Sequence, residues 1–252
     1  RFIVSNLYDF DHNNDFNAVE QFVSTISPDS IDAYAIEQTK TFQDNVLNQY
    51  QQYQFRLVNQ SIYQFCNDTL SSFYCSAVKD RLYCDSSKSE RRIQTQFTLR
   101  YILECLVRCL SPILPHTCDE VMECLLGNDT STHQGTQSLQ FSTLSANPKW
   151  ESVMEIRKQV LKLLENAKEN GIENSLDAGI ELPETLDITE FSNELADIFG
   201  VSRVSFSETN ELKIIDLRDQ PCCERSWKRD ETVSERDDGS ILSERDYHAI
   251  NQ

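Results

Sequence analysis

The sequence predicts a mainly helical protein, in which an antiparallel helical bundle is followed by a small α/β domain and a charged tail. Glycine and proline are scarce, at six residues each in 252. Apolar residues recur every three or four positions over long stretches, which is typical of amphipathic helices. The chain is also longer than a usual single domain and can bury a core without disulfides. We therefore expect two or three structural units.

The first unit is predicted over residues 1–127. Apolar stripes at helical spacing predict its helices over residues 32–53, 55–77, 99–110 and 116–126. The first of these follows turn and capping residues at 27–30, and Pro112 and Pro115 end the third. Helices of this length joined by short turns pack as an antiparallel bundle.

Three further segments follow the bundle. The polar residues 128–149 are expected to form a linker. Residues 150–219 predict a small α/β domain, with a helix that stops at Gly171 and three short β-branched runs. In this interpretation residues 207–210 turn the second strand directly into the third. The tail, 220–252, is too poor in large hydrophobic residues to fold alone without a staple.

The net charge of −18 argues against a nucleic-acid partner, because phosphate contacts supply much of the affinity of such proteins. Basic clusters nevertheless occur at 91–92 and 225–229. An acidic body also repels RNA everywhere except at its intended groove, which favours specific over general binding. The charge therefore restricts where RNA can bind without excluding it.

We expect a cytoplasmic chain without a membrane partner, because no apolar run approaches the roughly 18–20 residues that cross a bilayer. No secretory signal precedes the nine cysteines, and most of them fall in helical apolar patterns. Reduced thiols are therefore expected rather than disulfides. Arg1 lies inside a motif and no methionine precedes it, so we interpret the chain as a fragment.

The run KDRLYCD at 79–85, and SERRIQTQFTLRYILECLVRCLSPILPHTCDEV at 89–121, resemble the anticodon-binding region of isoleucyl-tRNA synthetase, a class I aminoacyl-tRNA synthetase. Residues 1–11 resemble that family's entry into the domain, and 150–182 its later helix, turn and strand. The resemblance implies the helical bundle and a junction domain. It also implies a role in translation, where this region binds the anticodon arm of isoleucine tRNA.

The resemblance further implies a parent ligase that joins isoleucine to its tRNA with ATP and Mg²⁺. No HIGH-like or KMSKS-like segment occurs in the chain, and the family uses those segments to hold ATP. No Ser-His-Asp order, glycine-rich phosphate loop or HExxH motif occurs either. We therefore expect no catalytic residue in this chain and an inactive fragment. Its expected partner is a catalytic domain of the same monomeric polypeptide, N-terminal to Arg1.

The family ends in a zinc knuckle with two Cys-x2-Cys pairs, and the tail keeps that spacing without the ligands. The four ligand positions are held by Cys223, Ser226, Ser243 and Asp246. A serine hydroxyl stays protonated near neutral pH and binds zinc poorly, so one thiol and one carboxylate remain. We expect a degenerate knuckle that holds no zinc.

The resemblance and the local charge together indicate candidate RNA-binding residues. They are Lys79, Arg81, Arg91, Arg92, Arg225, Trp227, Lys228 and Arg229. Trp227 stands where the family carries a tryptophan that can stack on a base, and the basic residues can hold phosphates. The alternatives are ion pairs with Asp80, Asp85 and Glu90 for the first cluster, and packing of the tail by the indole for Trp227. Tyr83 and Trp150 are predicted to cover apolar stripes.

Two alternatives stay open at this point. The equivalent region of a valyl or leucyl enzyme has a similar bundle, although KDRLYCD and the knuckle spacing favour the isoleucyl enzyme. The second is a stand-alone helical interaction module that has lost RNA binding, which the acidic charge and the missing zinc ligands favour.

Overall fold

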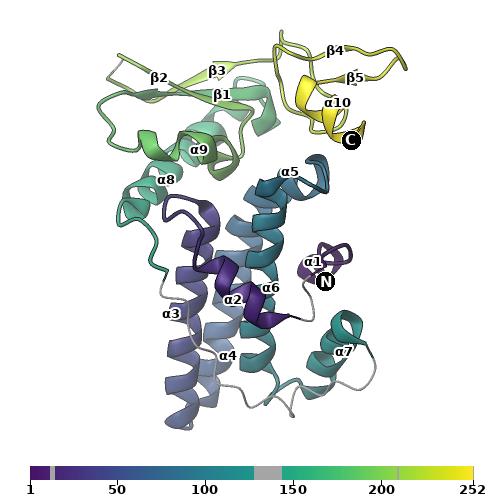
Figure 1. Cartoon of the computed structure of the whole chain (residues 1–252). Helices are drawn as coiled ribbons and strands as arrows, with labels where there is room; N and C mark the ends of the chain where they lie inside the picture. The colour runs from purple at the N-terminus through teal and green to yellow at the C-terminus, as the bar shows by residue number, and fades with distance from the viewer. Residues whose placement is uncertain (12–14, 128–143, 209, 252) are drawn as a thin grey trace. The chain divides into compact units, whose positions relative to one another are not determined.

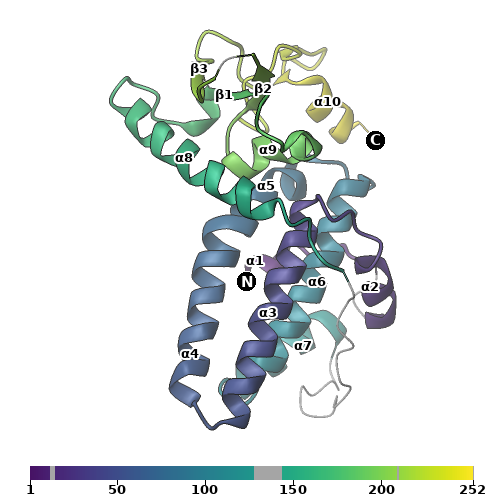
Figure 2. The same cartoon turned by 90° about the vertical axis from the view of Figure 1, so that its left-hand side faces the viewer.

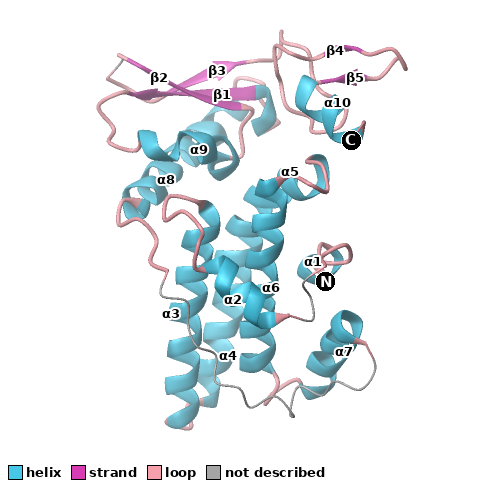
Figure 3. Cartoon of the chain, in the orientation of Figure 1, coloured by secondary structure: helices cyan, strands magenta, loops and turns pink. Residues whose placement is uncertain are grey.

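The computed structural model describes residues 1–11, 15–127, 144–208 and 210–251. It divides the chain into two compact units, the first built from residues 1–76 and 90–146 and the second from 77–89 and 147–252. Most of the described chain is helical, with two small sheets in the second unit, as predicted (Figure 3). None of the helices within these ranges is long and apolar enough to span a bilayer. The predicted linker lies mostly outside the described residues.

The regular secondary structure in the described residues of the first unit is entirely helical. Its helices are α1 (Phe2–Ser5), α2 (Phe16–Val23), α3 (Ile31–Gln51), α4 (Phe55–Gln64), the π-helix η1 (Phe65–Tyr74), α6 (Glu90–Leu110) and α7 (Pro115–Leu126). The long helices α3, α4 and α6 lie side by side (Figures 1 and 2). Ser30 caps α3 as predicted, because its hydroxyl accepts from the backbone N–H groups of Asp32 and Ala33.

Stacked aromatic rings and a buried carboxylate lie in the core of this unit. Phe42 stacks on Phe65 with ring centroids 4.1 Å apart. Asp32 is fully buried and accepts hydrogen bonds from the Tyr74 hydroxyl, at 2.5 Å, and from the Thr95 hydroxyl, at 3.3 Å. Buried polar groups are tolerated when they are paired in this way. The chain turns between α3 and α4, and Tyr53 has a positive φ of 57° there.

The second unit contains α5 (Cys75–Cys84) from Ala77 onward, and the helices and strands after residue 147. The helices are α8 (Trp150–Lys168), η2 (Ser175–Asp177), η3 (Thr189–Phe191), α9 (Ser192–Phe199) and α10 (Glu244–Ile250). The strands are β1 (Ala178–Pro183), β2 (Arg203–Ser207), β3 (Lys213–Asp216), β4 (Ser234–Glu235) and β5 (Ile241–Leu242). Residues 77–89, which we placed in the bundle from sequence, therefore group with the second unit.

The larger sheet has the order β2-β1-β3, so β1 lies between the second and third strands, although these two follow each other in sequence. Strand β1 pairs parallel with β2 and antiparallel with β3. A parallel pair needs a crossover, and η3 and α9 supply it, with Phe191, Leu195 and Ile198 buried. Trp150 is 3% exposed and packs edge-on against Phe191, which confirms the prediction that it covers an apolar surface.

The tail belongs to the second unit and has a small core of its own. Strands β4 and β5 pair antiparallel, and α10 follows. Cys223, Val233 and Leu242 are buried together, with Tyr247 packed against them. So few apolar side chains give little stabilisation, and the polar contacts described below matter correspondingly more.

Candidate nucleic-acid interface

A tight hairpin opens the tail and presents Trp227. Cys222 and Arg229 form a β-bridge. Inside it the Cys223 N–H donates to the Lys228 carbonyl at 3.0 Å, and the Trp227 N–H donates to the Cys223 carbonyl at 2.8 Å. These bonds close a tight turn over residues 223–228.

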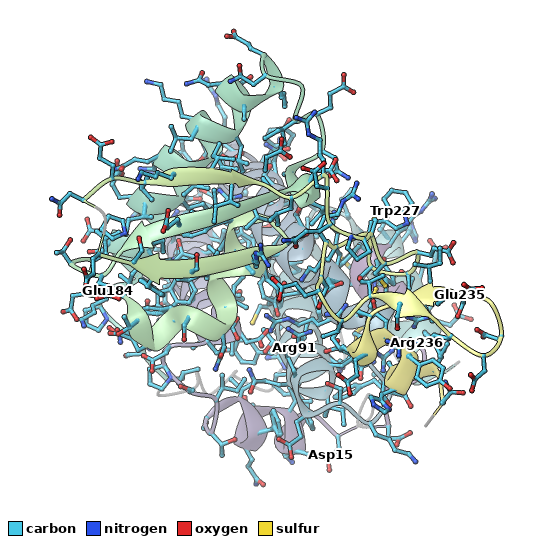
Figure 4. All side chains as sticks on the ribbon, turned by 90° about the horizontal axis from the view of Figure 1, so that it is seen from above. Asp15, Arg91, Glu184, Trp227, Glu235 and Arg236 are labelled. Carbon is cyan, nitrogen blue, oxygen red and sulfur yellow. The ribbon has the colours of Figure 1, made fainter. Side chains whose placement is uncertain are left out.

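Trp227 combines a strained backbone with an exposed side chain. Its φ is 61°, in the left-handed region that costs a non-glycine residue about 1–2 kcal/mol. Its side chain lies at the edge of the tail, 63% exposed (Figure 4). The exposure contradicts the packing alternative. Because such strain persists only when surrounding structure enforces it, Trp227 is a candidate contact residue.

The four positions of the knuckle ligands meet in the core of the tail. The Cys223 thiol donates to Asp246 Oδ2 at 2.9 Å, and the Ser243 N–H donates to Cys223 Sγ at 3.4 Å. The Ser243 hydroxyl caps α10 by accepting from the Asp246 N–H. Ser226 Oγ is buried and makes no hydrogen bond of good geometry among the described residues, although it lies close enough to help lower the pKa of Asp246.

These side chains do not suit a metal ion. Burial acts to raise the pKa of the Asp246 carboxyl, but the Cys223 thiol, Ser226 and the Arg245 guanidinium outweigh it and hold that pKa below its usual value. Of the residues at the four ligand positions, Cys223 alone carries sulfur, and its thiol donates to this carboxylate. Within the described ranges, no group of three or more His, Cys, Asp or Glu side chains is arranged to hold a metal.

An acid–base cluster surrounds the hairpin, and we define it as Asp80, Asp197, Lys228, Arg245 and Asp246. Asp80 on α5 accepts from Lys228 Nζ at 3.1 Å and from two nitrogens of Arg245 at 2.6 and 3.2 Å. Lys228 Nζ also donates to Asp197 at 3.0 Å, and Arg245 Nη2 lies 2.8 Å from Asp246 Oδ1. Burial acts to raise the pKa of Asp80, yet Arg245 and Lys228 hold it far below its ordinary value. The cluster is therefore charged at neutral pH.

The predicted basic residues of the second unit are mostly engaged within the chain. Arg81 is fully buried and pairs with Glu194 and Asp197 at 3.0 and 3.1 Å. Arg229 pairs with Asp177 at 2.7 Å. Arg225 donates to the carbonyls of Tyr83 and Cys84. Lys79 is exposed. Contact between any of these residues and RNA stays a prediction.

The other two predicted residues, Arg91 and Arg92, belong to the first unit at the start of α6. Arg92 is buried and pairs with Asp9 at 2.9 Å, whereas Arg91 is partly exposed (Figure 4). The structure thus brings Arg81, Arg225, Trp227 and Lys228 into one unit and leaves Arg91 and Arg92 in the other.

Sequence reasoning missed two residues of the second unit. Tyr83 is 57% exposed, so the prediction that it covers an apolar stripe is wrong. Its carbonyl accepts from Arg225, two residues before Trp227, at 2.9 Å. Arg245 was not singled out, although its position beside the fourth ligand position was a usable signal. Both are held by polar contacts between segments more than 100 residues apart, which hydrophobic periodicity does not reveal.

The comparisons with known proteins point in one direction. The family profile described as the anticodon-binding domain of tRNA ligase matches residues 32–182. An isoleucine–tRNA ligase of Shewanella oneidensis is 31% identical over 226 residues, which is 87% of this chain and 23% of the relative. One from Shewanella sp. strain ANA-3 is 32% identical over the same share. The chain therefore spans about a quarter of the length of the curated relatives it matches.

Proposed function

Because the chain belongs to the family of anticodon-binding domains of tRNA ligases, we propose that it is the part of an isoleucine–tRNA ligase that binds the anticodon arm. The names of its relatives favour isoleucine over valine or leucine as the amino acid of the parent reaction. In that reaction ATP drives attachment of isoleucine to its tRNA. The sequence contains no HIGH-like or KMSKS-like segment, so adenylate formation is assigned to another part of the parent enzyme.

The exposed side chain of Trp227 is the structural observation that best supports RNA binding at this site. An indole that is 63% exposed offers a flat face on which an unpaired base can stack. Its strained φ and the closed hairpin fix the backbone from which the ring projects, which limits the backbone entropy that binding would otherwise lose. Lys228 and Arg229 pair with internal acids, and Arg225 donates to two backbone carbonyls, so stacking is expected to contribute more of the binding here than charge does.

Binding of labelled isoleucine tRNA to the whole 252-residue chain, followed by fluorescence anisotropy, tests the proposal. Trp227→Ala is expected to weaken binding by about 1–3 kcal/mol, the usual worth of one stacked base, and Trp227→Phe by less. Tyr63→Ala removes an aromatic side chain of similar exposure on α4 and serves as the control. Equal affinity of the wild-type chain for an unrelated tRNA, with no effect of Trp227→Ala, would instead favour the interaction module.

A further inference from the structure

Cys223, Ser243 and Asp246, which stand at three of the family's ligand positions, lie in contact in the tail although they do not suit a metal. In the family's arrangement a zinc ion would connect two halves of the tail, the hairpin at 222–229 and the segment at 243–246. Here the Cys223 thiol donates a hydrogen bond to Asp246, and the remaining two ligand positions are held by Ser226 and Ser243. The two halves are nonetheless joined, the hairpin is closed, and Trp227 keeps its positive φ.

The acid–base cluster joins the same two halves. Lys228 belongs to the hairpin and Arg245 to α10, and both donate to the one carboxylate of Asp80. Asp80 is 10% exposed at its side chain, and the carboxylate of Asp246 is fully buried. Charges buried in this way are costly to leave unpaired, so the cluster resists any movement that separates its members. Buried ion pairs of this kind fix geometry more than they add stability.

We propose that Arg245 and Lys228, bound together on Asp80, take the place of the metal and hold the hairpin that presents Trp227. In this arrangement Arg245 is a positioning residue that fixes α10 against α5 through Asp80 and fixes Asp246 beside Cys223. Lys228 follows Trp227 directly, so its pairs with Asp80 and Asp197 fix the backbone on which the indole stands. The tail is thereby a folded, metal-independent knuckle.

Hydrogen exchange of the whole chain, followed by mass spectrometry, tests the ion-pair link. Arg245→Met keeps an unbranched side chain but removes the ion pairs with Asp80, Asp85 and Asp246. The amides of Cys223 and Trp227, which close the hairpin, should then exchange at least about tenfold faster, while those of β1 stay protected. Lys149→Met is the matched control, because it removes a surface ion pair with Asp187 and Glu190 in the same unit. Lys228→Met provides a second variant should Arg245→Met fail to fold.

Metal dependence is measured on the same chain. Exchange of the wild-type hairpin should be unchanged by EDTA and by added zinc, and metal analysis should find no stoichiometric zinc. The triple variant Ser226→Cys, Ser243→Cys and Asp246→Cys, which supplies four thiols with Cys223, should bind zinc, and Arg245→Met should then no longer speed exchange.

The proposal is overturned if Arg245→Met and Lys228→Met leave the hairpin as protected as Lys149→Met does, or if EDTA opens the wild-type hairpin. The proposal would also be overturned if Arg245→Met still sped hairpin exchange in the zinc-loaded triple variant. The ion pairs and the metal would then not hold the hairpin in the same way. None of these measurements uses RNA, so their outcome is independent of the proposed function.

Discussion

At the scale of single residues, the second unit places two exposed aromatic side chains on either side of one arginine. Arg225 donates to the Tyr83 carbonyl, and Trp227 follows two residues later. Tyr83 is 57% exposed and Trp227 is 63% exposed. Other tyrosines of the chain are exposed as well, and what distinguishes Tyr83 is that its carbonyl binds Arg225, two residues before Trp227. We therefore predict that Tyr83 belongs to the same candidate interface as Trp227.

We predict that Tyr83→Ala weakens binding of isoleucine tRNA by about 1 kcal/mol or more, the lower end of the value for one stacked base. Tyr83→Phe should retain the affinity, because stacking uses the ring and not the hydroxyl. Anisotropy titration measures both, and circular dichroism checks that the variants fold. If Tyr83→Ala binds as tightly as the control Tyr63→Ala, the interface ends at Trp227.

The buried thiols predict a loss of stability in alkali. Burial raises the pKa of Cys109 to about 12 and that of Cys75 to about 11. The ordinary thiol value is about 8.5, so the folded chain favours the protonated form and the unfolded chain releases the proton first. This contribution to stability is complete below the unfolded pKa and is lost as pH rises toward the folded one.

Urea unfolding between pH 8 and 10.5 should therefore show a falling free energy of unfolding. Cys109→Ala should flatten that fall, although it lowers stability at every pH by leaving a small cavity. Cys124 is exposed, so Cys124→Ala should leave the pH dependence unchanged. Equal pH dependence in the wild type and in Cys109→Ala would contradict the assignment.

At the scale of elements, buried polar groups decide where α6 begins. Its apolar stripe starts near Leu99, yet the helix starts at Glu90. The intervening Thr95, Gln96 and Thr98 are buried and paired, for example through Gln96 to the Asn6 carbonyl at 3.0 Å. Paired polar groups can occupy a helix face that packs like an apolar one.

Asp32 is the centre of this polar packing, and we predict that Asp32→Ala lowers the free energy of unfolding by about 3 kcal/mol or more. The substitution leaves the buried hydroxyl donors of Tyr74 and Thr95 without this acceptor, and each such group costs about 1–3 kcal/mol. Asp44→Ala removes an exposed carboxylate from the same helix and should change stability little. Chemical denaturation compares the two, and similar losses would contradict the role of Asp32.

The sequence predicted those helices whose positions are defined by the spacing of apolar residues. The stripe at 32–53 corresponds to α3, and the stripe at 55–77 to α4, η1 and the start of α5. The start of α6, the sheet order and the exposure of Tyr83 depend on polar contacts between distant segments, which no local pattern records. The same holds for Asp80, whose partners Lys228 and Arg245 lie about 150 residues away along the chain.

At the scale of the whole molecule, the net charge of −18 and the internal ion pairs both reduce the electrostatic attraction of the chain for RNA. Arg81, Arg92, Lys228 and Arg229 each pair with a carboxylate of the chain, so little of their charge is available to phosphates. The acidic remainder repels RNA over much of the surface. Affinity for a nucleic acid must then depend on stacking and on few phosphate contacts.

We predict that binding of isoleucine tRNA by this chain is weak and that its log–log slope against salt lies between about −1 and −3. Each neutralised phosphate contributes about 0.7–0.9 to that slope, and among the predicted basic residues Lys79 and Arg225 are exposed and Arg91 is partly exposed. The double variant Lys79→Ala with Arg91→Ala should flatten the slope by about one to two.

Trp227→Ala should weaken binding with little change in slope, because stacking releases few ions. Lys158→Ala, on the exposed face of α8, is the control for general charge. A wild-type slope steeper than about −5 would mean that the paired arginines exchange their carboxylates for phosphates on binding.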